Sequence, residues 1–325
     1  MAVRPDWDKY ANEICRELEY WGTILGPADI PTIFFGGGTP SLMPTSTFSQ
    51  IMNKINHCFR IAKDCEVTLE SNPGTLDAAR MTEFIESGVN RLSVGVQSLN
   101  DTELEFMGRR HTVHDALGLL DAAGKRGIRV SADFIYGLPG HTADTVIGMC
   151  RDINRLGLQH CSMYELTIEP DTPFGKMGLE MPSNNEMADM YTAIGDTLNL
   201  TRYEISNYAA PGFECRHNLN IWDGAPYIGI GRGAAGRIYT TDGWFEQMGA
   251  GARFSPLSPE ARATEKIITG MRTVRGVKIT PDTEKIINWD WVSQNPDLIK
   301  EQDKRLCATP DGVLTLEHML VELIK

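Results

Sequence analysis

The segment GVNRLSVGVQSLND, residues 88–101, contains the repeating unit that decides the fold. Its centre, RLSVGVQ (91–97), is a short run of β-forming residues. Gly88 stands where a preceding helix should end, because glycine readily adopts the left-handed conformation that follows a helix. A helix that ends at a glycine and leads into a strand is typical of a βα repeat.

Similar β-rich runs lie on both sides of this segment. The five runs begin 34, 25, 38 and 31 residues apart, which is about one βα unit each. Between them apolar residues recur at helical spacing, and Gly127 and Gly157 stand at two further helix ends. This alternation predicts a parallel sheet with right-handed crossovers, either doubly wound or barrel-like. The four other runs are TIFFG (32–36), EVTLESN (66–72), RVSADFIY (129–136) and HCSMYELT (160–167).

The two ends of the chain depart from this pattern. The chain opens with an amphipathic helix at about 7–21, and no strand precedes it. We therefore expect the first strand of the series to be missing and the run 32–36 to lie at an edge of the sheet. Near the other end, Pro310-Asp311-Gly312 predicts a turn between a short strand and a terminal helix. We expect three parts: a barrel-type core at 1–170, an extension at 171–257 and a small helical or winged-helix-like domain at 258–325.

Composition narrows the class of protein. The 325 residues carry a net charge of -12, which argues against a broad nucleic-acid surface. The sequence has no apolar run near the roughly 20 residues that cross a bilayer, and its first residues do not resemble a signal peptide. The seven cysteines are scattered and do not resemble a disulfide framework. We expect a cytoplasmic protein with reduced thiols.

Functional groups in a parallel α/β sheet gather at the carboxyl ends of its strands. Here every expected strand ends in glycine or polar residues. Three consecutive glycines, 36–38, expose backbone N–H and C=O groups to a ligand, although they also suit a plain turn. Glu70 suits ribose hydroxyls or an amine, or else it is satisfied by nearby helix N-termini. The same choice between ligand contact and a structural role applies to four other polar residues: Gln97, Arg109, Asp133 and Thr167.

Two later segments carry weaker signals. Gly231-x-Gly233-x-x-Gly236 matches a dinucleotide fingerprint, but no second βα unit follows it, so we reject that interpretation. His217 lies in a turn-like segment, RHNLNIW (216–222), and is either structural or a ligand of heme or a metal.

Taken together, the motifs of the chain resemble the oxygen-independent coproporphyrinogen III oxidase-like radical S-adenosylmethionine (SAM) proteins, above all their heme-chaperone branch. The matching segments run in the family's order over about residues 5–240. They are FFGGGTPSLM (34–43), EVTLESNPGT (66–75), GVNRLSVGVQSLND (88–101), GRRH (108–111), DFIYGLPGHT (133–142), YELTIEPDT (164–172), YEISNYA (203–209), RHNLNIW (216–222) and YIGIGRGAAG (227–236).

The resemblance implies a fold, cofactors and roles for residues. The fold would be an open, partial (β/α)6 barrel of the TIM type. Gly37, Gly38 and Thr39 would line the methionyl group of SAM, and Glu70 would hold its ribose. His217 would bind heme. The SAM or substrate side of the barrel mouth would be completed by Gln97, Arg109, Asp133, Thr167 and Ala235.

The sequence also departs from the family. The three thiolates of the family's CxxxCxxC motif hold a [4Fe–4S] cluster, and no three cysteines here have that spacing. We therefore expect no metal ligands, weak affinity for SAM and no radical chemistry from these residues alone. Ile221 replaces the tyrosine of HNxxYW, and Ala235 replaces the histidine of GAHG.

Three functions stay open at this point. The first is an N-terminally incomplete heme chaperone, with heme or porphyrin as ligand and a heme-accepting protein as a possible partner. The second is an oxidase that decarboxylates the propionates of coproporphyrinogen III. The third is a binding or scaffold protein that works without the cluster.

Overall fold

A seven-stranded sheet dominates the computed structural model, which describes residues 5–172, 174–248 and 254–325. Its strand order is β1-β2-β3-β4-β5-β7-β6, and the pairs from β1 to β5 are parallel, while β7 and β6 add in antiparallel fashion. The predicted α/β partial barrel is thereby confirmed. The strands are β1 (Asp29–Phe35), β2 (Arg60–Ser71), β3 (Arg91–Gln97), β4 (Arg129–Tyr136), β5 (His160–Glu165), β6 (Thr201–Arg202) and β7 (Asn207–Ala209).

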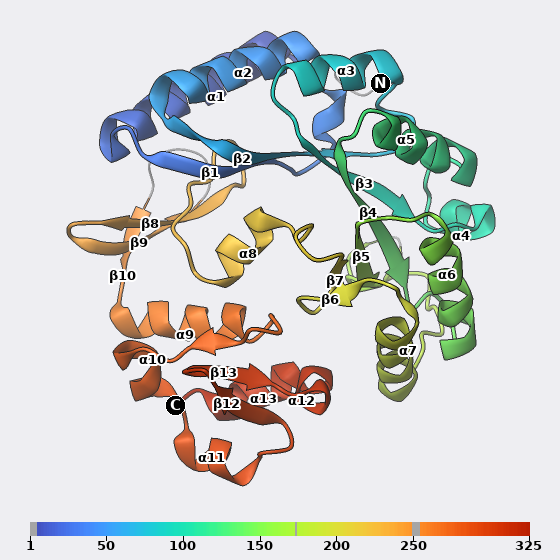
Figure 1. Ribbon diagram of the computed structural model, residues 1–325, viewed down its shortest axis with the longest axis vertical. Coiled ribbons are helices and arrows are strands. Elements are labelled where there is room, and N and C mark those ends of the chain that lie inside the picture. Colours follow the sequence, from blue (N-terminus) through green and yellow to red (C-terminus); the bar gives the residue numbers. More distant parts are fainter. Residues whose placement is uncertain (1–4, 173, 249–253) are drawn as a thin grey trace.

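Helices cover the outer side of the sheet, and α8 lies on its inner side, between the sheet and the C-terminal part of the chain (Figure 1). The predicted helix ends are found, since Gly88, Gly127 and Gly157 have φ values of 111°, 67° and 62° directly after a helix cap. The helices are α1 (Trp7–Leu25), α2 (Thr45–Cys58), α3 (Ala78–Glu86), α4 (Asp101–Phe106), α5 (Val113–Lys125), α6 (Ala143–Arg155), α7 (Asn184–Thr197) and α8 (Arg216–Trp222).

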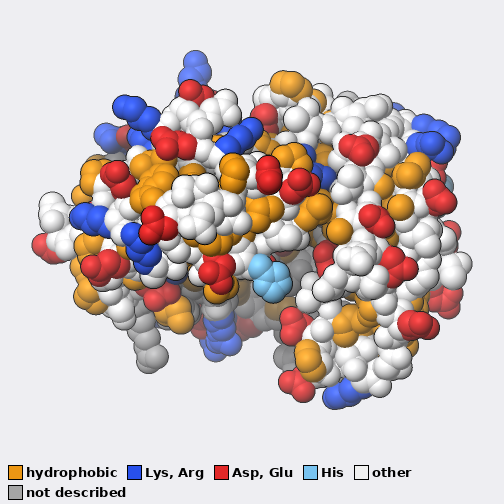
Figure 2. All heavy atoms as spheres, turned by 90° about the horizontal axis from the view of Figure 1, so that it is seen from below, with side chains coloured by type: hydrophobic (Ala, Val, Ile, Leu, Met, Phe, Trp, Pro, Cys, Tyr) orange, Lys and Arg blue, Asp and Glu red, His pale blue; other side chains and the backbone are white. Residues whose placement is uncertain are grey.

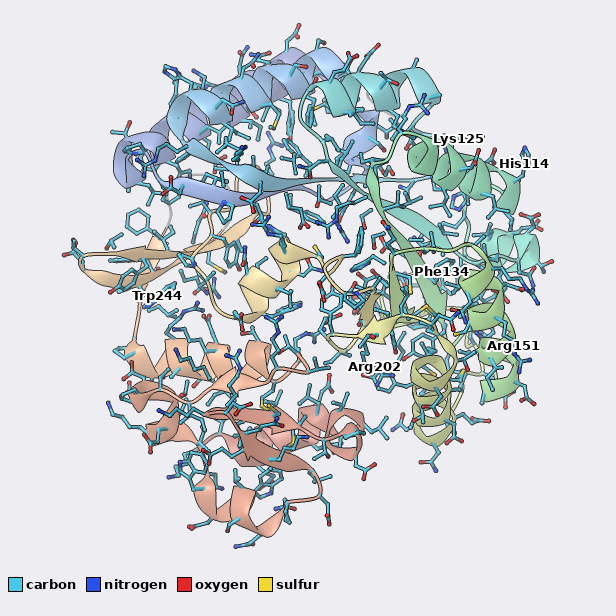
Figure 3. All side chains as sticks on the ribbon, viewed as in Figure 1. His114, Lys125, Phe134, Arg151, Arg202 and Trp244 are labelled. Atoms are coloured by element: carbon cyan, nitrogen blue, oxygen red, sulfur yellow. The ribbon has the colours of Figure 1, made fainter. Side chains whose placement is uncertain are left out.

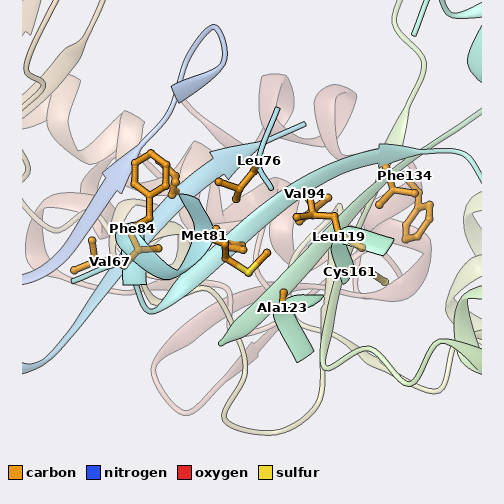
Figure 4. Close-up of a cluster of buried hydrophobic side chains, with 14 of the residues drawn as sticks. Val67, Leu76, Met81, Phe84, Val94, Leu119, Ala123, Phe134 and Cys161 are labelled. Carbon is orange, nitrogen blue, oxygen red and sulfur yellow. The ribbon is translucent and has the colours of Figure 1, made fainter. Parts of the chain in front are cut away.

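The two faces of the sheet differ in chemistry because side chains alternate along a strand. On β2, Val67 and Leu69 are buried in the apolar core on the side of the outer helices. Val67 shares this core with Met81 and Phe84 of α3 (Figure 4). Glu66, Thr68 and Glu70 occupy the alternate positions of the same strand. The apolar core therefore lies outside the curl of the sheet, and the inner face is polar.

A small sheet and a C-terminal unit complete the chain. The unit predicted at 258–325 holds helices and a three-stranded antiparallel sheet around its own apolar core. The short strand expected before Pro310 is β13, whereas β11 and β12 were not predicted. The small sheet contains β8 (Ala235–Thr240), β9 (Gly243–Met248) and β10 (Phe254–Leu257). The C-terminal elements are α9 (Pro259–Gly270), β11 (Val277–Lys278), α10 (Pro281–Ile286), α11 (Trp289–Gln294), β12 (Ile299–Gln302), β13 (Arg305–Ala308), α12 (Pro310–Leu314) and α13 (Leu316–Leu323).

Two local predictions need correction. Pro310-Asp311-Gly312 opens α12 and is not a turn, because Thr309 caps that helix by accepting the N–H of Gly312, and proline suits the first helical turn. The segment 216–222 is helical rather than turn-like.

Strand β1 lies at an edge of the sheet, and the surface of the molecule carries charges of both signs. Within the described residues β1 pairs only with β2, so it forms an edge of the sheet. Acidic and basic side chains are interspersed with hydrophobic ones on the face seen in Figure 2. None of the helices in the described ranges has the length and apolar character needed to cross a membrane.

The hairpin of β12 and β13 turns through Asp303 and Lys304, whose φ values are 52° and 59°. Positive φ at both central residues is the type I′ geometry, in which glycine is favoured at the second position. Lys304→Gly should therefore raise the free energy of unfolding by about 0.5–1 kcal/mol, measured by urea denaturation. Lys300→Gly, in the neighbouring strand, should lower it, and equal losses in both variants would contradict the turn assignment.

Candidate functional site

The inner face of the sheet presents rows of polar side chains. In-register pairing places Glu70 beside Ser93, Ser93 beside Ser131, and Asp133 beside both Gly95 and Ser162. These positions come from four different strands and point to the same side. The inner faces of β2 to β5 therefore form one polar surface.

The triple glycine after β1 is tied to the end of β2. The backbone N–H of Gly37 donates to Glu70 Oε2 at 2.9 Å, and Asn72 Nδ2 donates to Thr39 Oγ1 at 3.1 Å. Gly37 and Gly38 have φ values of 82° and 60°, and a Cβ atom built on either would meet no other atom within 4 Å. The loop therefore needs glycine for its conformation and leaves open space beside the backbone.

The end of β3 approaches the same place. Gln97 has a φ of 69°, a left-handed conformation that is uncommon for a residue with a side chain. A Cβ atom on Gly95 would come within 2.7 Å of both Asn72 Oδ1 and Gln97 Nε2. Gly95 thus leaves room for both amides over the strand. We call the residues that meet here the strand-end group: Gly37, Gly38, Thr39, Glu70, Asn72, Gln97 and Asp133.

Two carboxylates give the strand-end group its electrostatic character. Burial raises the pKa of Asp133, although it accepts hydrogen bonds from Ser93 Oγ at 2.9 Å and Ser131 Oγ at 3.3 Å. Burial also raises the pKa of Glu70; the N–H of Gly37 opposes this shift, and the charge of Asp133 adds to it. A cationic ligand would favour the charged form of both carboxylates and so offset the effect of burial and of their mutual repulsion.

The other expected SAM residues lie outside these contacts. Arg109 follows α4 and Thr167 follows β5, so both belong to loops at the carboxyl ends of strands, and both are exposed. Ala235 is exposed on β8, in the separate three-stranded sheet. Their roles toward SAM stay predictions.

His217 lies in the first turn of α8, on the inner side of β1. Its Nδ1 is 3.1 Å from Thr32 Oγ1, and its ring stacks on Phe34 with centroids 4.9 Å apart. Burial lowers the pKa of His217, so the imidazole is neutral at neutral pH. Nε2 has no hydrogen-bond partner among the residues that the structure describes. A neutral ring with one nitrogen held and the other free is suited to bind a metal centre.

Glu66 is not among the residues predicted from the sequence, and Asn72 was expected only as a polar residue at a strand end, with no role of its own. Glu66 is only 2% exposed and accepts the backbone N–H groups of Arg216 and His217 at 3.3 and 3.1 Å. The available signal was the alternation of EVTLES, in which acidic and hydroxyl side chains recur at every second position of a buried strand.

The cysteines do not fit an iron–sulfur cluster. All seven are free, and burial raises the pKa of Cys65 and Cys215 to about 11 and that of Cys150 to about 12. Cluster ligands are thiolates, so such thiols are poor ligands where they stand. No three His, Cys, Asp or Glu side chains in the described part of the chain are grouped to hold a metal ion.

Comparisons with known proteins agree on one family. The family model described as "Radical SAM superfamily" matches residues 4–153. The heme chaperone HemW of Escherichia coli (strain K12) is 35% identical over 240 residues, which are 73% of this chain and 64% of that protein. HemW of Synechocystis sp. (strain ATCC 27184 / PCC 6803 / Kazusa) is 34% identical over 294 residues, 83% of this chain and 70% of that protein. The chain thus spans slightly less than two thirds of the E. coli relative.

A solved structure supports the fold. Coproporphyrinogen III oxidase (HemN) from Escherichia coli, a radical SAM enzyme, superposes with a TM-score of 0.77 and 18% identity. The superposition covers 97% of this chain and 82% of that one. At this identity the likeness concerns the fold alone.

Proposed function

This chain belongs to the HemW heme chaperone family of radical SAM proteins, and from that premise we propose that it binds heme and SAM at two places on the inner face of its sheet. Heme would bind at His217 of α8, and SAM at the strand-end group. The natural partner would be a protein that accepts heme in the cytoplasm.

The strand-end group fits SAM on physical grounds. SAM carries a sulfonium and an ammonium group, and the two carboxylates Glu70 and Asp133 have pKa values that a cation would bring down. The open backbone at Gly37 and Gly38 can receive the polar methionyl end, and one oxygen of Glu70 stays available while the other accepts the N–H of Gly37. Bound SAM would supply an activated methionyl–adenosyl sulfonium; because the residues do not fit the cluster, we assign no radical step.

One observation carries the heme proposal: Nε2 of His217 has no hydrogen-bond partner among the described residues. Thr32 holds the opposite nitrogen and Phe34 stacks on the ring, and in the tautomer whose Nδ1–H donates to Thr32 Oγ1, Nε2 presents a lone pair in a set direction. An axial histidine held in this way supplies a nitrogen ligand to the heme iron.

Heme titration of the His217→Ala variant tests the proposal. We expect at least tenfold weaker binding and a changed Soret band, because the axial nitrogen is lost. His114→Ala is the matched control, since His114 is exposed on α5, away from α8 (Figure 3). An unchanged spectrum in His217→Ala would return that residue to a structural role and favour a protein that works without heme at this position.

A further inference from the structure

Helix α8 is short and contains no fully buried residue, which is unusual for a helix inside a fold. It spans seven residues, Arg216–Trp222, and none of them is fully buried. A helix this short is unstable alone and normally depends on a buried apolar face. Besides the contacts of His217 with Thr32 and Phe34, contacts at its two ends therefore hold α8 in place.

The sheet holds the N-terminal end. Glu66 of β2 accepts the first backbone N–H groups of α8, and Arg216 reaches Asp64 Oδ2 at 3.0 Å. Negative charge at a helix N-terminus accepts hydrogen bonds from the free N–H donors and interacts favourably with the positive end of the helix dipole. This end is fixed by the same unit that carries the strand-end group.

The C-terminal unit holds the other end through three arginines. Arg305 of β13 pairs with Asp223 at 2.9 Å, and Arg272, directly after α9, stacks on Trp222 with its Cζ 4.8 Å from the ring centre. Arg262 of α9 donates to the carbonyl of Gly224 at 2.5 Å. Positive charge near a helix C-terminus is favourable, so each contact stabilises α8 in one position.

The same arginines are anchored in other elements. Arg262 is 5% exposed and lies over Trp244 of β9 at 4.1 Å, while Arg272 stands 3.7 Å from the buried Glu204 between β6 and β7. Gly224 has a φ of 73°, and a Cβ atom there would come within 3.1 Å of Arg262 Nη2. Glycine at position 224 thus lets Arg262 approach the end of α8.

We propose that Arg262, Arg272 and Arg305 form a clamp by which the C-terminal unit positions His217 for heme. The inference rests on the proposed function at His217 and extends the heme site to residues of a different unit. The three arginines are positioning residues, since they act through the far end of α8 and not on the ligand.

Arg272→Gln and Arg305→Gln test the clamp without removing the most buried arginine. Each should weaken heme binding about three- to tenfold and shift the Soret band, and amide hydrogen exchange of α8 should become faster. Asp223→Asn should weaken heme binding as much as Arg305→Gln does. The double variant should bind heme only slightly more weakly than either single variant, because both changes remove the same ion pair. Arg305→Lys, which keeps the charge, should restore most of the affinity.

Arg126→Gln is the matched control, because Arg126 also joins two elements, through the carbonyls of Ala78 and Ala122, but lies on the outer side of the sheet. It should leave heme binding and the exchange of α8 unchanged. If heme binding depends on His217 but not on Arg272 or Arg305, the clamp is overturned and the proposed function stands. If wild-type binding does not depend on His217, the proposed function falls, and the positioning role falls with it.

Discussion

Replacement of Glu66 by alanine should lower the free energy of unfolding by about 3–5 kcal/mol and abolish heme binding at His217. The carboxylate is almost fully buried and has four partners: the backbone N–H groups of Arg216 and His217, the thiol of Cys215 at 3.6 Å and the guanidinium of Arg129 at 3.5 Å. Its loss leaves a partly buried charge and helix donors unpaired, which costs more than the pair itself contributes. Urea denaturation and heme titration of the same protein measure both effects.

Two variants bracket this prediction. Asp64→Ala removes an ion pair to Arg216 whose acidic side chain is 78% exposed, so it should cost less than about 1 kcal/mol. Glu66→Gln keeps an acceptor oxygen and should fall between the two. If Glu66→Ala unfolds as easily as Asp64→Ala, α8 is held by something other than this carboxylate.

The variant Glu70→Gln should gain stability and lose SAM. Burial raises the pKa of Glu70, so the folded state keeps its proton to higher pH than the unfolded chain does. Stability therefore falls as pH rises from the unfolded value of about 4.3 through the raised folded value, and it stays reduced at neutral pH. Glutamine cannot ionise and escapes this penalty, but it offers SAM no charge, so binding should weaken about 30- to 100-fold.

Thermal unfolding with and without SAM measures both effects. Glu70→Gln should have the higher melting temperature without ligand and the smaller increase with it. For the wild type, the increase should shrink as pH falls through the raised pKa of Glu70. Glu165→Gln is the control, because burial also raises the pKa of this carboxylate, which ends β5 but lies outside the strand-end group. It should leave the response to SAM unchanged. Equal responses of wild type and Glu70→Gln would remove Glu70 from the SAM site.

The sequence predicts most of the parallel sheet because its signals are local. Strands β3 and β4 have their predicted bounds, and β1 is displaced by few residues. The start of β2 at Arg60 was missed, since RIAKDC lacks a β pattern and pairs with β1 across an irregular register. Strands β6 and β11 have two residues each, and such short segments form only after distant parts of the chain have met.

The strand-end group could also be anticipated, because the carboxyl ends of parallel strands meet at one edge. The contact between Glu66 and His217 could not, since 151 positions separate them in the sequence. The contacts of Arg262, Arg272 and Arg305 with the end of α8 likewise join segments whose spacing in the sequence has no period. Topology is readable from local pattern, whereas polar contacts between distant units depend on the finished packing.

The lack of a fully buried residue in α8 has a consequence for motion. Charges and hydrogen bonds hold its seven residues at both ends. None of these residues belongs to the apolar core of the sheet. A segment of this kind can open at a lower free energy than the sheet itself unfolds. Opening of α8 would carry the ring of His217 away from Phe34 while the sheet stays folded. Under the proposed function, the rate of heme release would then be set by the opening of this one helical segment, while the rest of the molecule stays folded.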